Sequence, residues 1–334
     1  MSEFSLIDRY FSQATHLRTD VIAGIGDDAA ILQLADGQQL VAATDTLVAG
    51  VHFPEQTPAD AIGHKALAVN LSDLAAMGAT PAWALLALTL PGEDPQWLAG
   101  FVEGFSGLAQ QFDLSLVGGD TTRGPLTITV QLLGYLPAGS ALTRSGAKPG
   151  DRIFVTGKLG DAALGLRALQ SPPGANISSE QAESMKTLVK RLNYPQPRVA
   201  AGQAIRALAS SAIDISDGLL ADLGHILAAS GVGARLQRHQ LPRSESFITF
   251  SDIADADPES AWNRVLSGGD DYELCFTIAE DRAAALLALD WSSCNGITEV
   301  GSITAGNRLE VIDESGELLP LIGEQAQGYD HFSS

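Results

Sequence analysis

The chain has 334 residues, 45% hydrophobic and 18% charged, a composition that allows two domains and excludes a disordered protein. Its formal net charge of −20 argues against nucleic acid, and against an anionic membrane surface, as a general partner. Only Cys275 and Cys294 are present, so we expect free thiols and a reducing compartment. The N-terminus lacks signal-peptide features and no apolar run is long enough to span a membrane, which predicts a cytoplasmic protein.

Helical and strand patterns alternate through the first half of the chain. We expect a helix near 3–13, and a hairpin of 29–34 with 39–44 that turns at Asp36-Gly37. A helix begins at Thr57-Pro58 and ends before Gly78. The remaining predicted elements are a strand at 83–90, a helix near 95–112, a short strand at 114–117 with 118–122 as the loop after it, and a strand at 126–135.

The second half begins after a turn at Ala147–Asp151, and we predict an N-terminal domain of residues 1–145 and a C-terminal domain of 146–334. Its predicted strands are 152–156, 212–215, 272–278 and 297–303. Four helices are predicted: one after Asp161, one over 178–192, one after Pro197, and one from Ser216-Asp217-Gly218 to about Ser230. Segment 238–262 has no clear pattern. Mixed strands and helices in both halves indicate an α/β (α+β) fold.

Short Asp-rich segments beside glycines or at strand ends are the strongest functional signal. They are Gly26-Asp27-Asp28, Thr44-Asp45, Asn70-Leu71-Ser72-Asp73, Gly118-Gly119-Asp120-Thr121-Thr122, Asp214-Ile215-Ser216-Asp217-Gly218 and Gly268-Gly269-Asp270-Asp271. Two carboxylates about 4 Å apart repel by roughly 4 kcal/mol at an effective dielectric near 20. If these segments converge, hard divalent cations, chiefly Mg²⁺, are expected to neutralise them, and Mg²⁺ usually binds together with a phosphate.

Two carboxylates lie inside apolar segments. Asp73 lies in the almost wholly apolar helix that contains Asn70, and Asp214 lies inside an apolar strand. A buried carboxylate needs partners, which are either backbone N–H groups or a metal ion. The same choice between a structural cap and a metal ligand applies to Asp45 and Asp217, which lie at the ends of predicted elements.

Other candidate residues would contact a phosphorylated ligand. Arg123 and Arg144 are either phosphate ligands or members of surface salt bridges. His52 is either a phosphate contact or a structural histidine, and Tyr329 either stacks on a ligand or anchors the chain terminus. The two usual nucleotide motifs are absent, and no Ser-His-Asp order or Cys/His cluster indicates nucleophilic or zinc chemistry.

Taken together, six ordered motifs resemble the thiamine-monophosphate kinase family of the aminoimidazole ribonucleotide synthetase (PurM-like) superfamily. They are Ile25-Gly26-Asp27-Asp28-Ala29-Ala30, Thr44-Asp45 with Gly50-Val51-His52-Phe53, Asn70–Gly78, Leu116–Thr121, Asp214–Leu219 and Gly268–Leu274, and the resemblance runs from about residue 4 to the Gly-Tyr-Asp-His-Phe tail. The family commonly has Gly-Gly-Glu-Asp where this chain has Gly-Gly-Asp-Asp, so Asp270 is one methylene shorter.

The resemblance implies a two-domain PurM-like fold, a homodimer formed through the N-terminal domain, and ATP-dependent phosphorylation of thiamine monophosphate. Several Mg²⁺ ions would be held by Asp27, Thr44, Asp45, Asp73, Asp120, Asp214 and Asp217. ATP would contact Gly119, Asp120, Arg144 and Ser216, and the substrate would contact His52, Asp270 and Tyr329. We expect Asp27, Asp45, Asp73, Asp120 and Asp214 to form one metal-binding constellation drawn from both halves.

This activity needs no general base, since the attacking phosphate oxygen is already largely ionised at neutral pH. We therefore expect direct in-line transfer without a phosphoenzyme. Two alternatives stay open: another ATP-dependent enzyme of the superfamily, such as aminoimidazole ribonucleotide synthetase, or a non-catalytic module that binds a nucleotide or Ca²⁺. A selenophosphate synthetase should carry a reactive Cys or selenocysteine near its N-terminus, and none precedes Cys275. Hydrogenase-maturation relatives end in a Cys-bearing tail, whereas this chain ends His331-Phe332-Ser333-Ser334.

Overall fold

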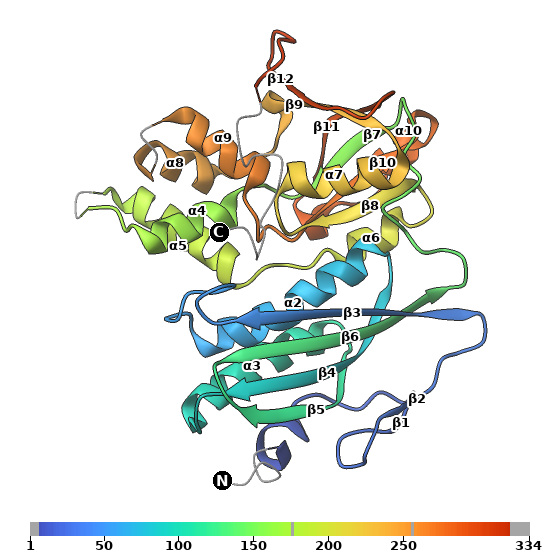
Figure 1. Cartoon of the computed structure of the whole chain (residues 1–334), viewed down its shortest axis with the longest axis vertical. Coiled ribbons are helices and arrows are strands. Elements are labelled where there is room, and N and C mark those ends of the chain that lie inside the picture. The colour runs from blue at the N-terminus through green and yellow to red at the C-terminus, as the bar shows by residue number, and fades with distance from the viewer. Residues whose placement is uncertain (1–6, 175–176, 255–256, 321–334) are drawn as a thin grey trace. The chain divides into compact units, whose positions relative to one another are not determined.

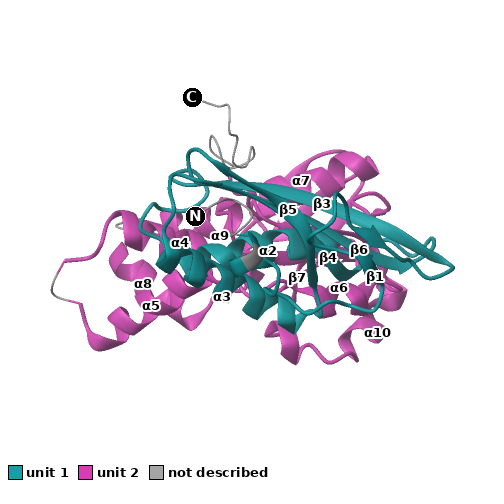
Figure 2. Ribbon diagram, turned by 90° about the horizontal axis from the view of Figure 1, so that it is seen from below, with its two compact units in different colours: residues 1–74, 79–141 teal, residues 75–78, 142–334 magenta. Residues whose placement is uncertain are grey.

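The computed structural model describes residues 7–174, 177–254 and 257–320 (Figure 1). The chain divides into two compact units: residues 1–74 with 79–141, and residues 75–78 with 142–334, which Figure 2 colours separately. Each unit combines sheet strands with packed helices, so the predicted α/β (α+β) class is confirmed. Among the described helices, none is both long and apolar enough to cross a lipid bilayer.

Unit 1 is built on a four-stranded sheet in the order β3-β6-β4-β5, in which only the β4–β5 pair is parallel. Its elements are η1 (Ile7–Phe11), β1 (Val21–Ala23), β2 (Ile31–Leu32), β3 (Gln38–Val48), α2 (Ala59–Ala76, whose last two residues fall in unit 2), β4 (Thr80–Leu90), α3 (Pro95–Gln111), β5 (Ser115–Arg123) and β6 (Thr127–Pro137).

Helices α2 and α3 cover one face of this sheet (Figure 1). Leu74 of α2 packs against Gly134 of β6, and Gly104 of α3 allows a close approach to α2, since a Cβ there would lie 1.8 Å from the Asp60 carbonyl oxygen. Every residue of α2 from 61 to 72 is buried. The apolar composition of this helix therefore reflects burial on most of its sides.

The predicted helices 57–77 and 95–112 and strands 83–90 and 126–135 of unit 1 are confirmed. The predicted hairpin is wrong, because β2 pairs with β1 whereas β3 pairs with β6 along all eleven of its residues. The predicted loop at 118–122 is also wrong: β5 continues through Gly118-Gly119-Asp120 to Arg123, since parallel pairing with β4 satisfies its backbone. At the N-terminus, the described part of the predicted helix is a five-residue π-helical turn, η1.

Unit 2 is built on a six-stranded mixed sheet in the order β12-β9-β11-β7-β10-β8. Its elements are β7 (Arg152–Thr156), α4 (Asp161–Gln170), α5 (Ser179–Asn193), α6 (Val199–Ile205), β8 (Ala209–Ile215), α7 (Leu219–Ser230), β9 (Gly233–Gln237), η2 (Arg238–Gln240), α8 (Glu245–Ala254), α9 (Pro258–Ser267), β10 (Glu273–Ile278), η3 (Glu280–Arg282), α10 (Ala283–Leu287), η4 (Ser292–Cys294), β11 (Ile297–Thr304) and β12 (Leu309–Ile312).

The predicted strands and helices of the second half are confirmed, and helix α5 begins with a capping box between Ser178 and Gln181. Segment 238–262, which has no clear sequence pattern, contains η2, α8 and the start of α9. Strand β10 is buried at all six residues and pairs with β7 and β8, so it is an internal strand of the unit 2 sheet. Both cysteines are free and buried, as expected.

Candidate functional site

Strand register separates two of the expected metal ligands within unit 1. Residues that pair across neighbouring strands form a row over the sheet. One row runs from Asp45 on β3 through Val130 on β6 and Leu86 on β4 to Gly119 on β5, and Asp120 on β5 belongs to the next row. Strands β3 and β5 are the two edges of the sheet, so three inter-strand spacings of about 4.8 Å place Asp45 and Asp120 roughly 14 Å apart.

Asp45 and Asp120 also lie on opposite faces of the sheet. The Asp45 row contains the buried Val130 and Leu86, on the face that the helices cover. The Asp120 row contains Ala87, Thr129 and Thr46 on the other face, where the Thr46 and Thr129 hydroxyls are 2.8 Å apart. Two ligands of one Mg²⁺ ion each place an oxygen at about 2.1 Å from it, so these carboxylates do not share an ion within one chain.

The face opposite the helices also carries Thr44 and the segment that contains Asp27. Thr44 belongs to the row of Gln131 on this face. Val21 and Leu32 flank the Asp27 segment and pack against a small core that contains Trp83 and Val117. Asp27 itself is exposed. Of the candidate ligands on the strands of unit 1, Thr44 and Asp120 therefore lie on this face and Asp45 on the helix-covered face.

Asp73 lies on helix α2, and His52 lies in the loop after β3. Asp73 is half-buried on α2, while its neighbour Asn70 is fully buried and donates to the Ala66 carbonyl at 3.2 Å. The Nδ1 atom of His52 accepts a hydrogen bond from the Val48 N–H at 2.9 Å. In the neutral imidazole the proton is therefore on Nε2, which makes Nε2–H the donor for a ligand.

In unit 2, the loop after β8 is organised by a carboxylate that sequence reasoning missed. Asp222 is buried on α7, and its Oδ2 accepts the N–H groups of Ser216, Asp217 and Gly218 at 3.0, 3.0 and 3.1 Å. Burial, together with the neighbouring Asp214 carboxylate, raises the pKa of Asp222 to about 8. The helix begins at Gly218 without a side-chain cap, so Asp217 is not its N-cap. An aspartate inside the apolar segment 219–227 was the available signal.

The Gly268–Tyr272 turn lies against this loop. The Asp270 N–H donates to the Ser216 carbonyl at 2.9 Å, and the Tyr272 N–H donates to the Ile215 carbonyl at 2.8 Å. The structure therefore brings together the candidate ATP contact Ser216 and the candidate substrate contact Asp270, as expected of two Asp-rich segments that converge.

A buried ion network supports the same turn from the strand side. Glu273 is fully buried, accepts from the Thr156 hydroxyl at 2.7 Å, and forms ion pairs with both Arg191 and Arg198. A charged residue inside the apolar strand 272–278 was a signal for this network that the motif search missed. Because each charge has a partner and further hydrogen bonds, the network is rigid rather than reactive.

Asp271 is the least satisfied carboxylate in the described part of the chain. Its Oδ2 accepts the Gly160 N–H at 2.8 Å, while the buried Oδ1 has no hydrogen-bond partner there. Burial raises the pKa of this carboxyl well above its ordinary value of 3.8. The carboxyl is therefore held in its protonated form to a higher pH than in an unfolded chain.

Replacing Asp271 by Asn is expected to raise the free energy of unfolding at neutral pH and to reduce its pH dependence. The folded wild-type protein retains a proton that the unfolded chain loses near pH 3.8, so stability falls as pH rises toward the folded pKa, by about 1.4 kcal/mol for each unit that separates the two pKa values. Urea unfolding at several pH values measures this slope. The exposed Asp281→Asn variant is the control, and an unchanged slope in Asp271→Asn contradicts the prediction.

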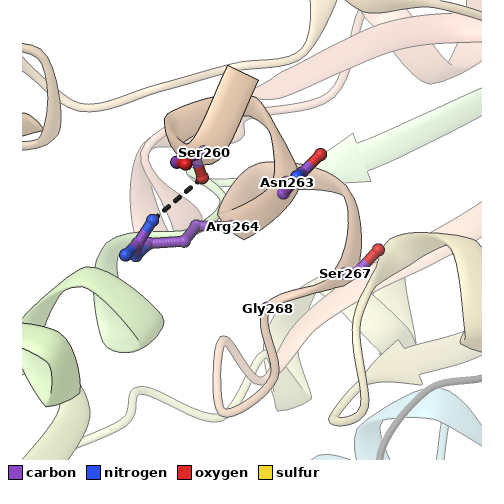
Figure 3. Close-up of a pocket in the computed structure, with 5 residues that line it drawn as sticks. All are labelled: Ser260, Asn263, Arg264, Ser267 and Gly268. Atoms are coloured by element: carbon purple, nitrogen blue, oxygen red, sulfur yellow. Dashed lines mark hydrogen bonds between the residues drawn. The ribbon is translucent and has the colours of Figure 1, made fainter. Parts of the chain in front are cut away.

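A cavity of about 320 Å³ opens on the polar side of α9, directly before the Gly268–Tyr272 turn (Figure 3). It is lined by Ser260, Asn263, Arg264, Ser267 and Gly268. The Arg264 guanidinium donates to the Ser260 carbonyl at 2.9 Å. The lining offers hydroxyl, amide and guanidinium groups, which suit a polar ligand.

The remaining candidates are exposed or lie outside the described residues. Gly119 lies on β5, and Arg123 at the end of that strand is exposed. Arg144 is also exposed, and neither arginine forms an ion pair with any described residue, which differs from the salt-bridge alternative. Tyr329 lies outside the described residues.

The candidate ligands fit Mg²⁺ in their chemistry, since carboxylate and hydroxyl oxygens are the donors it prefers. Within the described ranges of one chain, however, no three His, Cys, Asp or Glu side chains stand close enough together to hold an ion. The separation of Asp45 from Asp120 accounts for part of this result.

Comparison with known protein families covers most of the chain. Residues 26–136 match the N-terminal domain of AIR synthase related proteins, and residues 148–314 match the C-terminal domain of the same group. The thiamine-monophosphate kinase of Escherichia coli K12 is 49% identical over 334 residues, which are 99% of this chain and 98% of that protein.

Solved structures give the same result. The crystal structure of thiamine-monophosphate kinase from Stenotrophomonas maltophilia K279a is 47% identical with a TM-score of 0.84, covering 96% of this chain and 98% of its own. AaThiL complexed with AMPPCP and TMP is 30% identical with a TM-score of 0.76, covering 92% of each chain. The PurM-like two-domain architecture expected from the motifs is thereby confirmed.

Proposed function

The chain belongs to the thiamine-monophosphate kinase family, a branch of the AIR synthase related proteins, and from that premise we propose that it transfers the γ-phosphoryl group of ATP to thiamine monophosphate. The products are thiamine diphosphate and ADP. The observation that carries the proposal is the 49% identity to the E. coli kinase over 99% of the chain. The AaThiL structure with an ATP analogue and TMP supports the same pair of substrates.

The transfer is direct and in line. The acceptor is a phosphate oxygen whose second pKa near 6 leaves it largely ionised at neutral pH, so no side chain has to remove a proton. The chain then has to hold the two polyanionic substrates in line and to neutralise the repulsion between their phosphates. The proposed reaction therefore needs no general base and no enzyme nucleophile.

Mg²⁺ would be held by Asp27, Thr44, Asp45, Asp73, Asp120, Asp214 and Asp217, whose oxygens fit it in type. When bound, the ions would screen the repulsion between the two substrates and stabilise charge on the transferred group. Asp222 keeps the Ser216–Gly218 backbone in place through three hydrogen bonds and so supports the loop that carries Ser216 and Asp217.

The active form is a homodimer in which a second copy completes the metal site. Asp45 and Asp120 lie at opposite edges of the unit 1 sheet, and among described strands β3 and β5 each have one unpaired edge. A two-fold dimer that places β5 of one copy near β3 of the other brings each Asp120 to the partner copy's β3 edge. This arrangement supplies the ligands that one chain keeps roughly 14 Å apart, at about 4.8 Å for each strand spacing.

The remaining contacts divide between the two substrates. ATP contacts Gly119, Asp120, Arg144 and Ser216, and thiamine monophosphate contacts His52, Asp270 and Tyr329. His52 presents Nε2–H to the substrate, since Nδ1 already accepts from Val48. The cavity beside Gly268 offers amide and hydroxyl groups to the aminopyrimidine ring of thiamine. Two free, buried cysteines are compatible with a cytoplasmic location.

The proposal is tested by incubating the protein with ATP, Mg²⁺ and thiamine monophosphate and measuring both ADP and thiamine diphosphate. We expect the two products in equal amounts, no product with a chelator, and no product when unphosphorylated thiamine replaces thiamine monophosphate. Absence of turnover with Mg²⁺, Mn²⁺ and Ca²⁺ alike would show that the chain is not this kinase.

A further inference from the structure

The Gly268–Tyr272 turn has a backbone conformation that its sequence does not favour. Asp270 has φ 69° and Tyr272 has φ 51°, so two non-glycine residues within three positions are left-handed. Asp adopts this region more readily than most residues, whereas an aromatic residue there is an outlier. Such a conformation persists only where the surrounding structure determines it, and it occurs often at functional sites.

Three hydrogen bonds hold the turn in this conformation. Two run from the backbone N–H groups of Asp270 and Tyr272 to the carbonyls of Ser216 and Ile215, and the third joins the Gly160 N–H to Asp271 Oδ2. The turn also lies very close to the loop after β8, because a Cβ at Gly269 would be 2.5 Å from the Ser216 carbonyl oxygen. The turn is therefore held against the Ser216–Gly218 segment by two backbone hydrogen bonds, and against Gly160 by the third.

The consequence of this geometry is a side-chain contact between residues two apart. The Tyr272 hydroxyl donates a hydrogen bond to Asp270 Oδ1 at 3.1 Å. Tyr272 is only 8% exposed, so its ring is packed and its hydroxyl position is determined by the core. The bond therefore orients the half-buried Asp270 carboxylate from a fixed point inside unit 2.

Packing alone does not account for a tyrosine here. A phenylalanine would fill the same volume and leave no hydroxyl to satisfy in a buried place. The contact has a further effect on Asp270, whose side chain is short and loses rotamer freedom once one oxygen is engaged. A carboxylate held in one orientation binds a ligand at a lower entropic cost.

We propose that Tyr272 is a positioning residue that orients the Asp270 carboxylate for thiamine monophosphate. The proposal rests on the proposed function, in which Asp270 contacts this substrate. It assigns to Tyr272 an effect on the binding of one substrate, exerted only through Asp270.

A double-mutant cycle tests this role. Tyr272→Phe is expected to raise KM for thiamine monophosphate about 3- to 10-fold, the loss expected for one ordinary intramolecular hydrogen bond, with KM for ATP unchanged. In an Asp270→Ala background the same change is expected to have no further effect, because its target is gone. Tyr135→Phe removes a tyrosine hydroxyl in unit 1, where the Arg18 guanidinium lies 5.9 Å from the Tyr135 ring centroid, and is the matched control, expected to leave both KM values at wild type.

The outcomes separate this proposal from the proposed function. Suppose that the wild-type protein turns over. If Tyr272→Phe then changes KM equally with and without Asp270, or equally for both substrates, the role of Tyr272 is overturned and the proposed function stands. Absence of wild-type turnover overturns the proposed function and this inference with it. Thermal unfolding of each variant confirms that the fold is retained, since a purely structural role would lower the melting temperature without separating the two KM values.

Discussion

Mixing two inactive variants, Asp45→Asn and Asp120→Asn, is expected to restore about a quarter of wild-type activity, since half of the randomly formed dimers are mixed and each has one intact site. Each variant alone should lose at least about 100-fold in kcat, because in the proposed site it would remove a charged metal ligand. Asp45 and Asp120 lie on opposite edges of one sheet, so the proposed dimer would supply them to one site from two copies.

The mixture is prepared by co-expression with two different affinity tags, and the doubly tagged dimer is assayed for thiamine diphosphate formation. The control pairs Asp45→Asn with the double variant Asp45→Asn/Asp120→Asn, in which neither site has both carboxylates, and no activity is expected. An inactive doubly tagged dimer in the test mixture would mean that both carboxylates act within one chain. Near-wild-type kcat in both single variants would instead refute the metal-site assignment.

Arg198→Met is expected to lower the free energy of unfolding by about 3–5 kcal/mol. Arg198 is 5% exposed, and its Nε donates to Glu273 Oε2 at 2.6 Å at the start of β10, an internal strand of the unit 2 sheet. Without it, the fully buried Glu273 carboxylate retains Arg191 and Thr156 but lacks its most buried cation. Chemical denaturation monitored by circular dichroism measures the loss.

Two further variants distinguish burial from charge as the cause. Arg235→Ala breaks the exposed pair with Glu310 in the same sheet and is expected to change stability by no more than about 1 kcal/mol. The double variant Arg198→Met/Glu273→Leu replaces the buried ions with apolar groups and should recover part of the lost stability. A loss in Arg198→Met no larger than that in Arg235→Ala would show that the buried network contributes little.

Much of the fold could be predicted from local patterns. Helix α2 follows from an apolar run between Pro58 and Gly78, and β6 follows from alternating apolar residues. The errors occurred where pairing partners outweigh local signals. Gly118-Gly119 indicates a loop by composition, yet pairing with β4 makes it a strand, and Asp36-Gly37 indicates a hairpin although β3 pairs with β6.

The supporting residues of the site were harder to find than its motifs. Three supporting residues lie inside or beside apolar segments: Asp222, Tyr272 and Glu273. In such a segment the sequence does not show which group a single polar side chain contacts. Their roles depend on groups that the chain brings together over distances from a few residues to 117, as between Glu273 and Thr156. Periodicity carries no information about such contacts, since it describes only which face of an element is buried.

Residue types alone indicate the chemistry open to the chain: aspartates beside glycines, few basic residues and a net charge of −20 favour a cation next to any bound phosphate. Strand pairing and loop contacts, which the residue types do not reveal, set which of these groups lie close together. Strand order put Asp45 and Asp120 at opposite edges, and the Gly268–Tyr272 turn put Asp270 against Ser216. The reason is physical, because residue type sets what a side chain can bind, whereas strand pairing and hydrogen bonding set the distances at which it can act.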